Sequence, residues 1–218
     1  MPDLLIDLDN TIYSETEAIF SQIDLKMKSF ISSELNVSLE NAYVIQKKYF
    51  LKYGTTLRGL MMNHNVKPKY FLKYVHDINL KPIKKNLTLK KEMKKFSGRK
   101  IIFTNGTTEH ATNVLKKVGV FEEIDSIFDI EDAEYIPKPA LLPYKKIVNK
   151  YKITPHNAIM IDDIKANLIT AKKLKIGTVL ISKKKSPLLT NNKIDYVFGD
   201  ITSIIKKIND KDIFNETR

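Results

Sequence analysis

Short apolar runs alternate with helical stretches from about residue 98 onward, and this alternation limits the possible fold more than any other feature. The apolar runs lie at 101–103, 158–161, 177–181 and 196–198, and the helical stretches lie at 109–118, 140–151, 165–174 and 201–208. Strands that alternate with helices form a parallel sheet covered by helices. Together with an apolar run at residues 4–6, the pattern predicts an α/β fold: a Rossmann-like, doubly wound parallel sheet with helices on both faces.

The segment between the first apolar run and residue 98 has a different pattern. Helical periodicity falls at 15–33, 39–53 and 69–75. No convincing strand separates these stretches, and the segment is too long for a simple connection between a strand and a helix. We therefore predict an all-helical cap at residues 14–96, inserted after the first strand into an α/β core formed by residues 1–13 and 97–218.

Polar side chains follow the predicted strands at the points where the strands end. These residues are Asp7, Asp9, Thr104, Asn105, Asp162 and Asp163. In open parallel sheets, ligands bind beyond the carboxyl ends of the strands, so the six side chains could line one pocket. Asp7 and Asp9 are two crowded carboxylates, which repel each other unless a cation, a proton or a catalytic role separates their charges. One could attack as a nucleophile while the other moves a proton, so the pattern favours an enzyme.

The composition narrows the classes of function. The chain has 37 basic and 25 acidic residues, and its net charge of +12 comes almost entirely from lysines spread along the chain. Nucleic-acid binding is not favoured, because clustered charge and stacking aromatics are its signature. A positive field would instead help to recruit a small phosphorylated substrate.

The lack of cysteine excludes disulfides and thiolate chemistry within this sequence. No apolar stretch approaches the roughly 20 residues that a membrane-spanning helix needs. We expect a cytoplasmic protein without a membrane partner, and the sequence does not indicate its oligomeric state.

Four short stretches, in order along the chain, resemble the motifs of haloacid dehalogenase-like phosphatases. They are Asp7-Leu8-Asp9-Asn10-Thr11, Thr104-Asn105, Lys138-Pro139, and Asp162-Asp163 with Asn167. The resemblance covers nearly the whole chain and includes an inserted cap in the expected place. It implies a Mg²⁺-dependent phosphomonoesterase that works through an aspartyl-phosphate intermediate.

The resemblance assigns separate roles to the first two carboxylates. Asp7 would attack phosphorus as the nucleophile, and Asp9 would protonate the leaving oxygen and later take a proton from the attacking water. Members of the family that dehalogenate organic acids usually lack the second Asp, because a halide leaves without a proton. Asp9 therefore favours phosphate ester hydrolysis over dehalogenation.

The remaining motif residues also take roles by resemblance. Asp7, Asp163 and the backbone carbonyl of Asp9 would bind Mg²⁺, with Asp162 acting through a bound water, and oxygen ligands of this kind suit the ion. Thr104 would donate its hydroxyl to a phosphoryl oxygen. The remaining assignments are Lys138 as a counter-charge, Thr11 as support for the loop, and Asn167 as a residue that orients its neighbours.

A finer resemblance connects the chain with the pyrimidine 5′-nucleotidase branch. It rests on Asp7 to Tyr13, on residues 53–60 in the cap, and on Thr104-Asn105-Gly106 before His110. This branch hydrolyses nucleoside monophosphates such as UMP or CMP, and its relatives also act on sugar phosphates and lysophospholipids. The predicted substrate contacts are Tyr53, Arg58, Asn105 and Gly106.

Two other classes of protein remain as alternatives. A phospho-accepting receiver domain also clusters Asp, Thr and Lys, but its paired acidic residues follow the first strand, whereas Asp162-Asp163 comes late here. A basic binding module that has lost catalysis is the second alternative. The presence of Asp9 argues against it.

Overall fold

A computed structural model describes residues 1–183, 194–211 and 213. In this part of the chain, six strands form one sheet: β1 (Asp3–Ile6), β2 (Lys100–Phe103), β3 (Ser126–Phe128), β4 (Ala158–Asp162), β5 (Gly177–Ile181) and β6 (Tyr196–Phe198). All neighbouring strands pair in parallel, in the order β3-β2-β1-β4-β5-β6. The prediction of a Rossmann-like parallel sheet is therefore confirmed.

The strand order places β1 between β2 and β4 and brings three chain segments together at one edge of the sheet. Ile6 is the register partner of Ile102 on one side and of Ile161 on the other. The residues that follow these three positions therefore emerge side by side at the carboxyl ends of the strands. The strand order changes direction at β1, where sheets of this kind bind their ligands.

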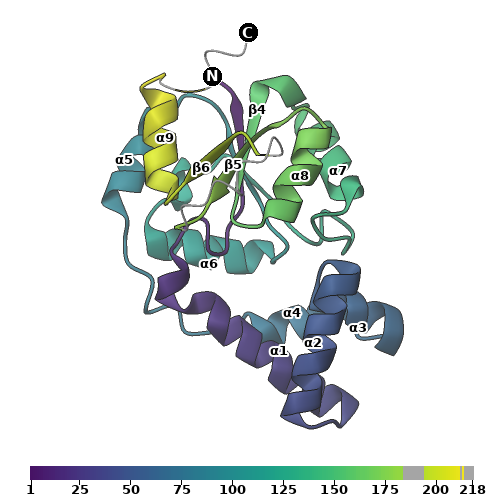
Figure 1. Ribbon diagram of the computed structural model, residues 1–218. Coiled ribbons are helices and arrows are strands. Elements are labelled where there is room, and N and C mark those ends of the chain that lie inside the picture. The colour runs from purple at the N-terminus through teal and green to yellow at the C-terminus, as the bar shows by residue number, and fades with distance from the viewer. Residues whose placement is uncertain (184–193, 212, 214–218) are drawn as a thin grey trace.

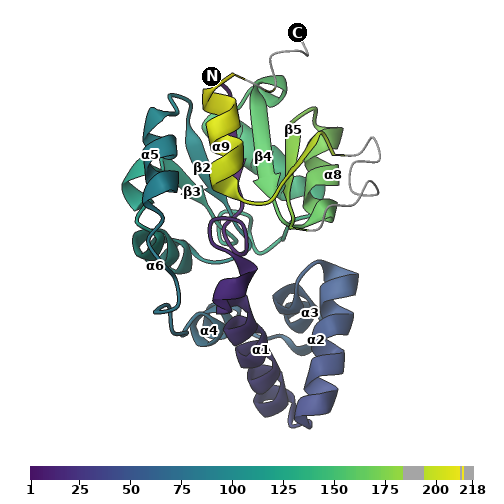
Figure 2. The same cartoon turned by 60° about the vertical axis from the view of Figure 1, so that its left-hand side comes forward.

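Helices cover both faces of the sheet, as the sequence predicted (Figure 2). They are α5 (Leu87–Lys95), α6 (Thr108–Val118) and α9 (Ile201–Asn209) on one face, and α7 (Leu141–Tyr151) and α8 (Lys165–Lys173) on the other. Successive residues of a strand point to opposite faces. Accordingly, Leu4 and Ile6 pack with the first group of helices and Leu5 packs with the second. Two apolar layers therefore bury Leu4, Leu5 and Ile6 of β1 in the centre of the core.

Four helices form the cap below the sheet edge (Figure 1): α1 (Ile19–Leu35), α2 (Leu39–Tyr53), α3 (Thr56–His64) and α4 (Pro68–Val75). The cap has an apolar cluster of its own, which includes Phe30, Leu60 and Phe71. The Ser38 side chain accepts a hydrogen bond from Asn41 N at the start of α2, which satisfies one free amide of the helix. Within the described residues, no helix has both the length and the apolar character needed to cross a bilayer.

The boundary at which the chain returns from the cap to the core lies earlier in the sequence than expected. Residues as far as 96 were predicted to belong to the cap, but Leu89, Met93 and Phe96 pack into the core cluster beside the sheet. The helix that carries the first two, α5, lies along α9 (Figure 1). Four of the nine residues of α5 are lysines, so the apolar side of this helix is narrow. The sequence of the helix therefore does not indicate whether it packs on the cap or on the core. We propose that the cap ends near residue 80.

Three of the helices and strands named above were absent from the sequence prediction: β3, α3 and α5. β3 escapes detection because it has only three residues, two of them half-buried. The helix α3 lies in a stretch for which no element was predicted, and Thr55 caps it by accepting a hydrogen bond from Arg58 N. The other helix and strand bounds differ from the predicted ones by a few residues at most.

The assignment of α5 to the core can be tested by a matched pair of substitutions on that helix. Leu89 is fully buried, whereas Leu87 is 72% exposed. Leu89→Ala should lower the free energy of unfolding by about 2–5 kcal/mol, because it leaves a cavity in the core. Leu87→Ala should change it little. Chemical denaturation measures both variants, and equal effects would contradict the assignment.

Candidate active site

A buried lysine joins the ends of three strands. The Lys138 side chain is 2% exposed, and its Nζ donates hydrogen bonds to Asp7 Oδ1 (2.7 Å), Asp162 Oδ2 (2.9 Å) and the Phe103 carbonyl (2.7 Å). These acceptors follow or end β1, β4 and β2, respectively. An ammonium group has three protons, so its donors are all used. Lys138 therefore fixes the positions of the two carboxylates relative to each other.

The amide of Asn105 holds the loop that carries this lysine. Its Oδ1 accepts a hydrogen bond from the backbone N–H of Lys138 (2.8 Å), and its Nδ2 donates to the Lys138 carbonyl (3.3 Å). Further along, Thr170 donates its hydroxyl to the Pro139 carbonyl (2.8 Å). Both polar atoms of the Asn105 side chain therefore bind this loop, and its contact with a substrate stays a prediction.

Asp162 faces the protein rather than an open site. It is completely buried, and both of its oxygens accept hydrogen bonds from Asn167 Nδ2 (2.9 and 3.0 Å). Oδ1 also accepts from the Ile164 backbone N–H (2.8 Å). The sequence interpretation gave Asp162 a role through a metal-bound water. Its hydrogen bonds go to Lys138, Asn167 and the Ile164 N–H, and the role through a metal-bound water stays a prediction.

Three carboxylates meet beside this lysine. Asp7, Asp162 and Asp163 each offer an oxygen, and the three oxygens lie within 4.8 Å of one another. Burial raises the pKa of Asp7, as do Asp162 and Asp163, while Lys138 opposes the shift. Burial and the charge of Asp162 raise the pKa of Asp163 to about 7. The cluster therefore has more negative charge than Lys138 balances, and its oxygen donors fit a hard divalent cation such as Mg²⁺.

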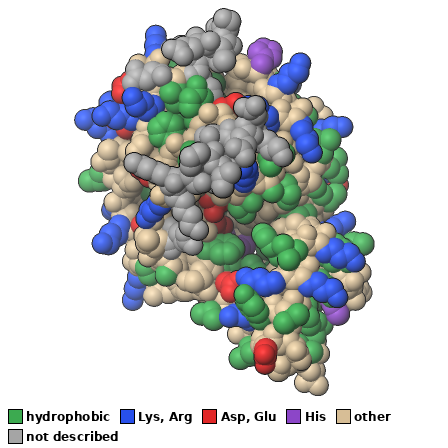
Figure 3. Space-filling view, in the orientation of Figure 1, with side chains coloured by type: hydrophobic (Ala, Val, Ile, Leu, Met, Phe, Trp, Pro, Cys, Tyr) green, Lys and Arg blue, Asp and Glu red, His purple; other side chains and the backbone are tan. Residues whose placement is uncertain are grey.

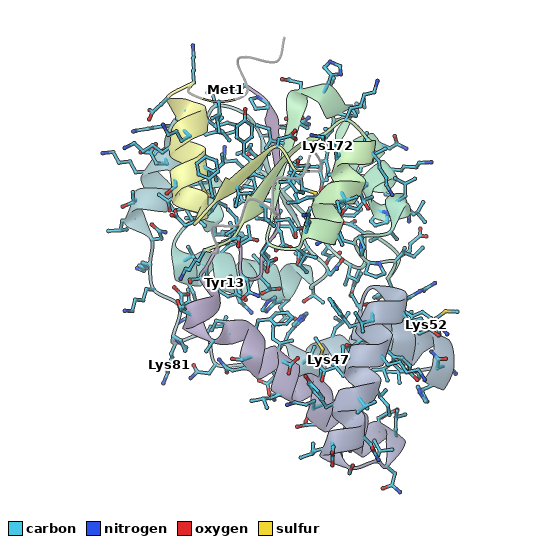
Figure 4. All side chains as sticks on the ribbon, in the orientation of Figure 1. Met1, Tyr13, Lys47, Lys52, Lys81 and Lys172 are labelled. Atoms are coloured by element: carbon cyan, nitrogen blue, oxygen red, sulfur yellow. The ribbon has the colours of Figure 1, made fainter. Side chains whose placement is uncertain are left out.

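Asp9 lies in a different environment. Its Oδ1 accepts hydrogen bonds from the Tyr13 hydroxyl (2.7 Å) and from His110 Nε2 (3.0 Å). Burial acts to raise the pKa of Asp9, but the charge and hydrogen bond of His110 and the Tyr13 hydroxyl outweigh it and hold the pKa below its usual value. Figure 4 shows Tyr13 where the core meets the first cap helix.

Sequence reasoning missed the functional contacts of Tyr13 and His110. Tyr13 lies four residues beyond Asp9 and could have been linked to it by that spacing. His110 is 101 positions away from Asp9 and gives no local signal beyond its place in the first turn of α6.

Thr104, the residue that follows β2, provides a hydroxyl group. The Thr104 side chain is 2% exposed, and its Oγ1 accepts a hydrogen bond from the Gly106 N–H (2.9 Å), which leaves the hydroxyl proton available for another acceptor. Thr11 Oγ1 is also buried and has no hydrogen-bond partner among the described residues. The Thr11 N–H bonds to the Leu8 carbonyl (3.3 Å) within the loop that follows β1.

The turn between α2 and α3 lies against the loop that carries the buried lysine. Gly54 has φ +85°, and a Cβ there would lie 3.3 Å from Pro137 Cγ and 3.4 Å from the Lys138 carbonyl oxygen. Glycine suits both the positive φ and the close approach. Of the predicted substrate contacts beside this turn, Tyr53 interacts through its hydroxyl with Asn63. Arg58 is half-buried, and no side-chain partner for it occurs among the described residues.

A separate cleft of about 1500 Å³ opens between the cap helix α4 and the core helix α6. Its lining includes His76, Thr107 and His110, together with Lys73 and Glu109, whereas the carboxylates around Lys138 do not line it. The His110 ring therefore separates this cleft from Asp9.

These features define a hydrolase-like α/β core with carboxylates at the strand ends and a helical cap. A family model described as haloacid dehalogenase-like hydrolase matches residues 4–175. The chain belongs to this family. The prediction made from the motifs is confirmed at that level, while the pyrimidine 5′-nucleotidase branch remains a prediction.

Individual relatives are more distant. Phosphate metabolism protein 8 of Saccharomyces cerevisiae is 27% identical over 202 residues, which cover 80% of this chain and 59% of that protein. The glyceraldehyde 3-phosphate phosphatase of Methanocaldococcus jannaschii is 23% identical over 93% of this chain and 94% of its own length. The crystal structure of a HAD phosphatase from Thermococcus onnurineus superposes with a TM-score of 0.62 at 18% identity and covers 97% of both chains. The structural similarity supports the fold.

The role of Lys138 in holding the carboxylates can be tested through stability. Lys138→Met would leave Asp7 and Asp162 buried without their cation, and breaking a buried pair in this way costs about 3–5 kcal/mol. The loss should shrink as the pH is lowered, since burial already raises the pKa of Asp7 and its protonation removes an uncompensated charge.

Denaturation of the variant at several pH values measures this effect. Lys145→Met on the exposed face of α7 serves as the matched control and should change stability little. A loss for Lys138→Met that stays the same at every pH would contradict the ion-pair explanation.

Proposed function

We propose that this protein is a Mg²⁺-dependent phosphomonoesterase that works through an aspartyl-phosphate on Asp7. The observation that carries the proposal is the contrast between two neighbouring carboxylates. Asp7 is held by the Lys138 ammonium and faces the other carboxylates, whereas Asp9 is held apart by Tyr13 and His110. Two carboxylates in different surroundings can take different roles in one site, and the positive charge of a divalent cation beside Asp7 would favour its ionised form despite its raised pKa. The phosphatase named among the relatives supports the same reaction class.

The proposed reaction has two displacements at phosphorus. In the first, a carboxylate oxygen of Asp7 forms a bond to phosphorus, the ester P–O bond breaks, and Asp9 gives its proton to the departing oxygen. In the second, Asp9 takes a proton from water, whose oxygen attacks phosphorus and releases phosphate from Asp7. Lys138 offsets charge on the phosphoryl group, and the Thr104 hydroxyl donates to one of its oxygens.

The metal would be held by the carboxylates of Asp7 and Asp163 and by the backbone carbonyl of Asp9. Bound Mg²⁺ would supply positive charge that lets an anionic nucleophile approach an anionic phosphoryl group. Burial first, and then the neighbouring carboxylates, raise the pKa values of Asp7 and Asp163, and a bound cation would offset both effects.

We propose a pyrimidine nucleoside 5′-monophosphate, such as UMP or CMP, as the substrate. The turn at residues 53–55 approaches the Lys138 loop, so Tyr53 and Arg58 lie in or just after a part of the cap that contacts the core near the catalytic groups. An arginine side chain suits a phosphate or a base edge, and a tyrosine ring can stack on a base. A sugar phosphate is the second candidate, because a relative is named for glyceraldehyde 3-phosphate. Lysophospholipids remain a further alternative.

Nucleic acid is not the proposed partner. Figure 3 shows Lys and Arg side chains spread over core and cap on this face rather than gathered into one patch. Spread charge of this kind provides a general attraction for phosphorylated molecules but no binding track.

Phosphate release from a panel of nucleotides, sugar phosphates and lysophospholipids tests the reaction. We expect release that requires Mg²⁺ and stops with EDTA. Asp7→Asn and Asp9→Asn should each lose at least about 100-fold in kcat, since they remove the nucleophile and the acid–base group. Asp77→Asn, at an exposed position in the cap, is the control. Full activity of Asp7→Asn, or no metal-dependent release from any substrate, would rule out the proposal.

The role of the cap turn is tested by Arg58→Ala. If Arg58 contacts the substrate, the variant should lose about 10-fold or more in kcat/KM for its preferred nucleotide, which corresponds to one charged hydrogen bond. The loss should be smaller for p-nitrophenyl phosphate, which has no nucleoside. Lys48→Ala removes an exposed cap charge on α2 and should leave the preference unchanged. Equal losses for all substrates would exclude a role for Arg58 in specificity.

A further inference from the structure

The carboxylate of Asp9 is held on one side only. Both of its hydrogen bonds, from Tyr13 and from His110, end on Oδ1. No described residue donates a hydrogen bond to Oδ2. The two oxygens therefore differ: one is fixed by donors, and the other is available to a substrate.

This asymmetry determines which oxygen can carry the proton for catalysis. A carboxylate only accepts hydrogen bonds, so His110 Nε2 must be the donor in the contact of 3.0 Å. An oxygen that already accepts two hydrogen bonds has little capacity left for a proton. The proton of the neutral acid therefore belongs on Oδ2, and the donors on Oδ1 stabilise the carboxylate that forms when Oδ2 gives its proton away.

The two donors do not hold Asp9 to the same part of the protein. Tyr13 belongs to the segment that follows β1, only four residues from Asp9, so the two can shift together. His110 comes from the first turn of α6, which follows β2 and Thr104. It is 3% exposed, so its ring is fixed by packing. His110 is the contact that ties the Asp9 carboxylate to the strand end where the phosphoryl group would bind.

A second histidine, from the cap, supports the His110 ring. The rings of His76 and His110 stack with centroids 4.3 Å apart and planes 11° from parallel. Thr107 Oγ1 accepts from the His110 backbone N–H (3.2 Å) and lies 3.2 Å from His76 Nδ1, so one hydroxyl links both residues. Gly106 leaves room for this arrangement, since a Cβ there would lie 3.3 Å from His110 Cδ2.

We propose that His110 is a positioning residue for the acid–base group: it orients Asp9 so that Oδ2 faces the leaving oxygen, and His76 at the end of α4 steadies its ring. This inference rests on the proposed function. His110 itself touches neither the substrate nor the attacked phosphorus. Its loss therefore affects proton transfer rather than nucleophilic attack or binding.

A comparison of substrates with different leaving groups distinguishes a positioning role of His110 from a purely structural one. An alkoxide, such as the 5′-oxygen of a nucleoside, needs a proton as it departs, whereas p-nitrophenolate departs readily without one. His110→Ala should lower kcat for a nucleoside monophosphate by about 10-fold or more, a share of what general acid catalysis contributes. KM should change little, and the loss with p-nitrophenyl phosphate should be clearly smaller. His110→Gln, whose amide can still donate, should recover part of the rate, and the shorter His110→Asn should not.

A double-mutant cycle shows whether His110 acts through Asp9. In an Asp9→Asn background, His110→Ala should cause almost no further loss, because the group that it positions is already gone. His156→Ala, at an exposed site, is the matched histidine control. Melting temperatures confirm that each variant is folded. If His110→Ala does not fold, the contrast between His110→Gln and His110→Asn takes its place.

Failure of the positioning role can be distinguished from failure of the phosphatase reaction. Equal losses for both leaving groups, or full additivity with Asp9→Asn, would overturn the positioning role while the phosphatase reaction stands. In crystals of His110→Ala, an unchanged Asp9 side chain would also overturn it, and a rotated carboxylate would support it. A wild-type protein that releases no phosphate from any ester would instead remove the proposed function on which this inference rests.

Discussion

The contact between the Lys138 ammonium and two buried carboxylates is the interaction on which the rest of the site depends. A buried ammonium is stable only when anions and hydrogen-bond acceptors surround it. Asp7, Asp162 and the Phe103 carbonyl provide these acceptors from three strands that are far apart in the sequence. The contact therefore requires that β1, β2 and β4 are adjacent and in register. In return, it holds Asp7 at the edge of the sheet.

The two carboxylates after β1 are neighbours in sequence but not in environment. Asp7 lies among Asp162, Asp163 and Lys138, where burial and then the charges of these neighbours set its pKa. Asp9 is governed by directional hydrogen bonds from Tyr13 and His110. Surrounding charges suit Asp7 as a nucleophile, because it must approach an anionic phosphoryl group with the help of a cation. Directional hydrogen bonds suit Asp9, because it must present one particular oxygen to the leaving group.

Much of the fold and part of the site could be predicted from the sequence. The strands β1, β2 and β4 are each an apolar run that is followed at once by, or ends in, polar residues. That local pattern indicates Asp7, Thr104 and Asp162 without any tertiary information. Interactions between distant segments leave no local signal: the contact of His110 with Asp9 spans 101 positions and was not predicted, and that of Lys138 with Asp7 spans 131 and was expected only through the family resemblance. The packing of α5 on the core was missed for the same reason, since only its contact with α9 reveals its place.

The central claim is that Asp7 becomes covalently phosphorylated. Rapid acid quenching during turnover, followed by mass spectrometry of the N-terminal peptide, tests it most directly. The account predicts a phosphorylated peptide with the group on Asp7, accumulating in wild type and absent in Asp7→Asn. Phosphate release by wild-type protein with no phosphorylated carboxylate, or with the group on a residue other than Asp7, would contradict it.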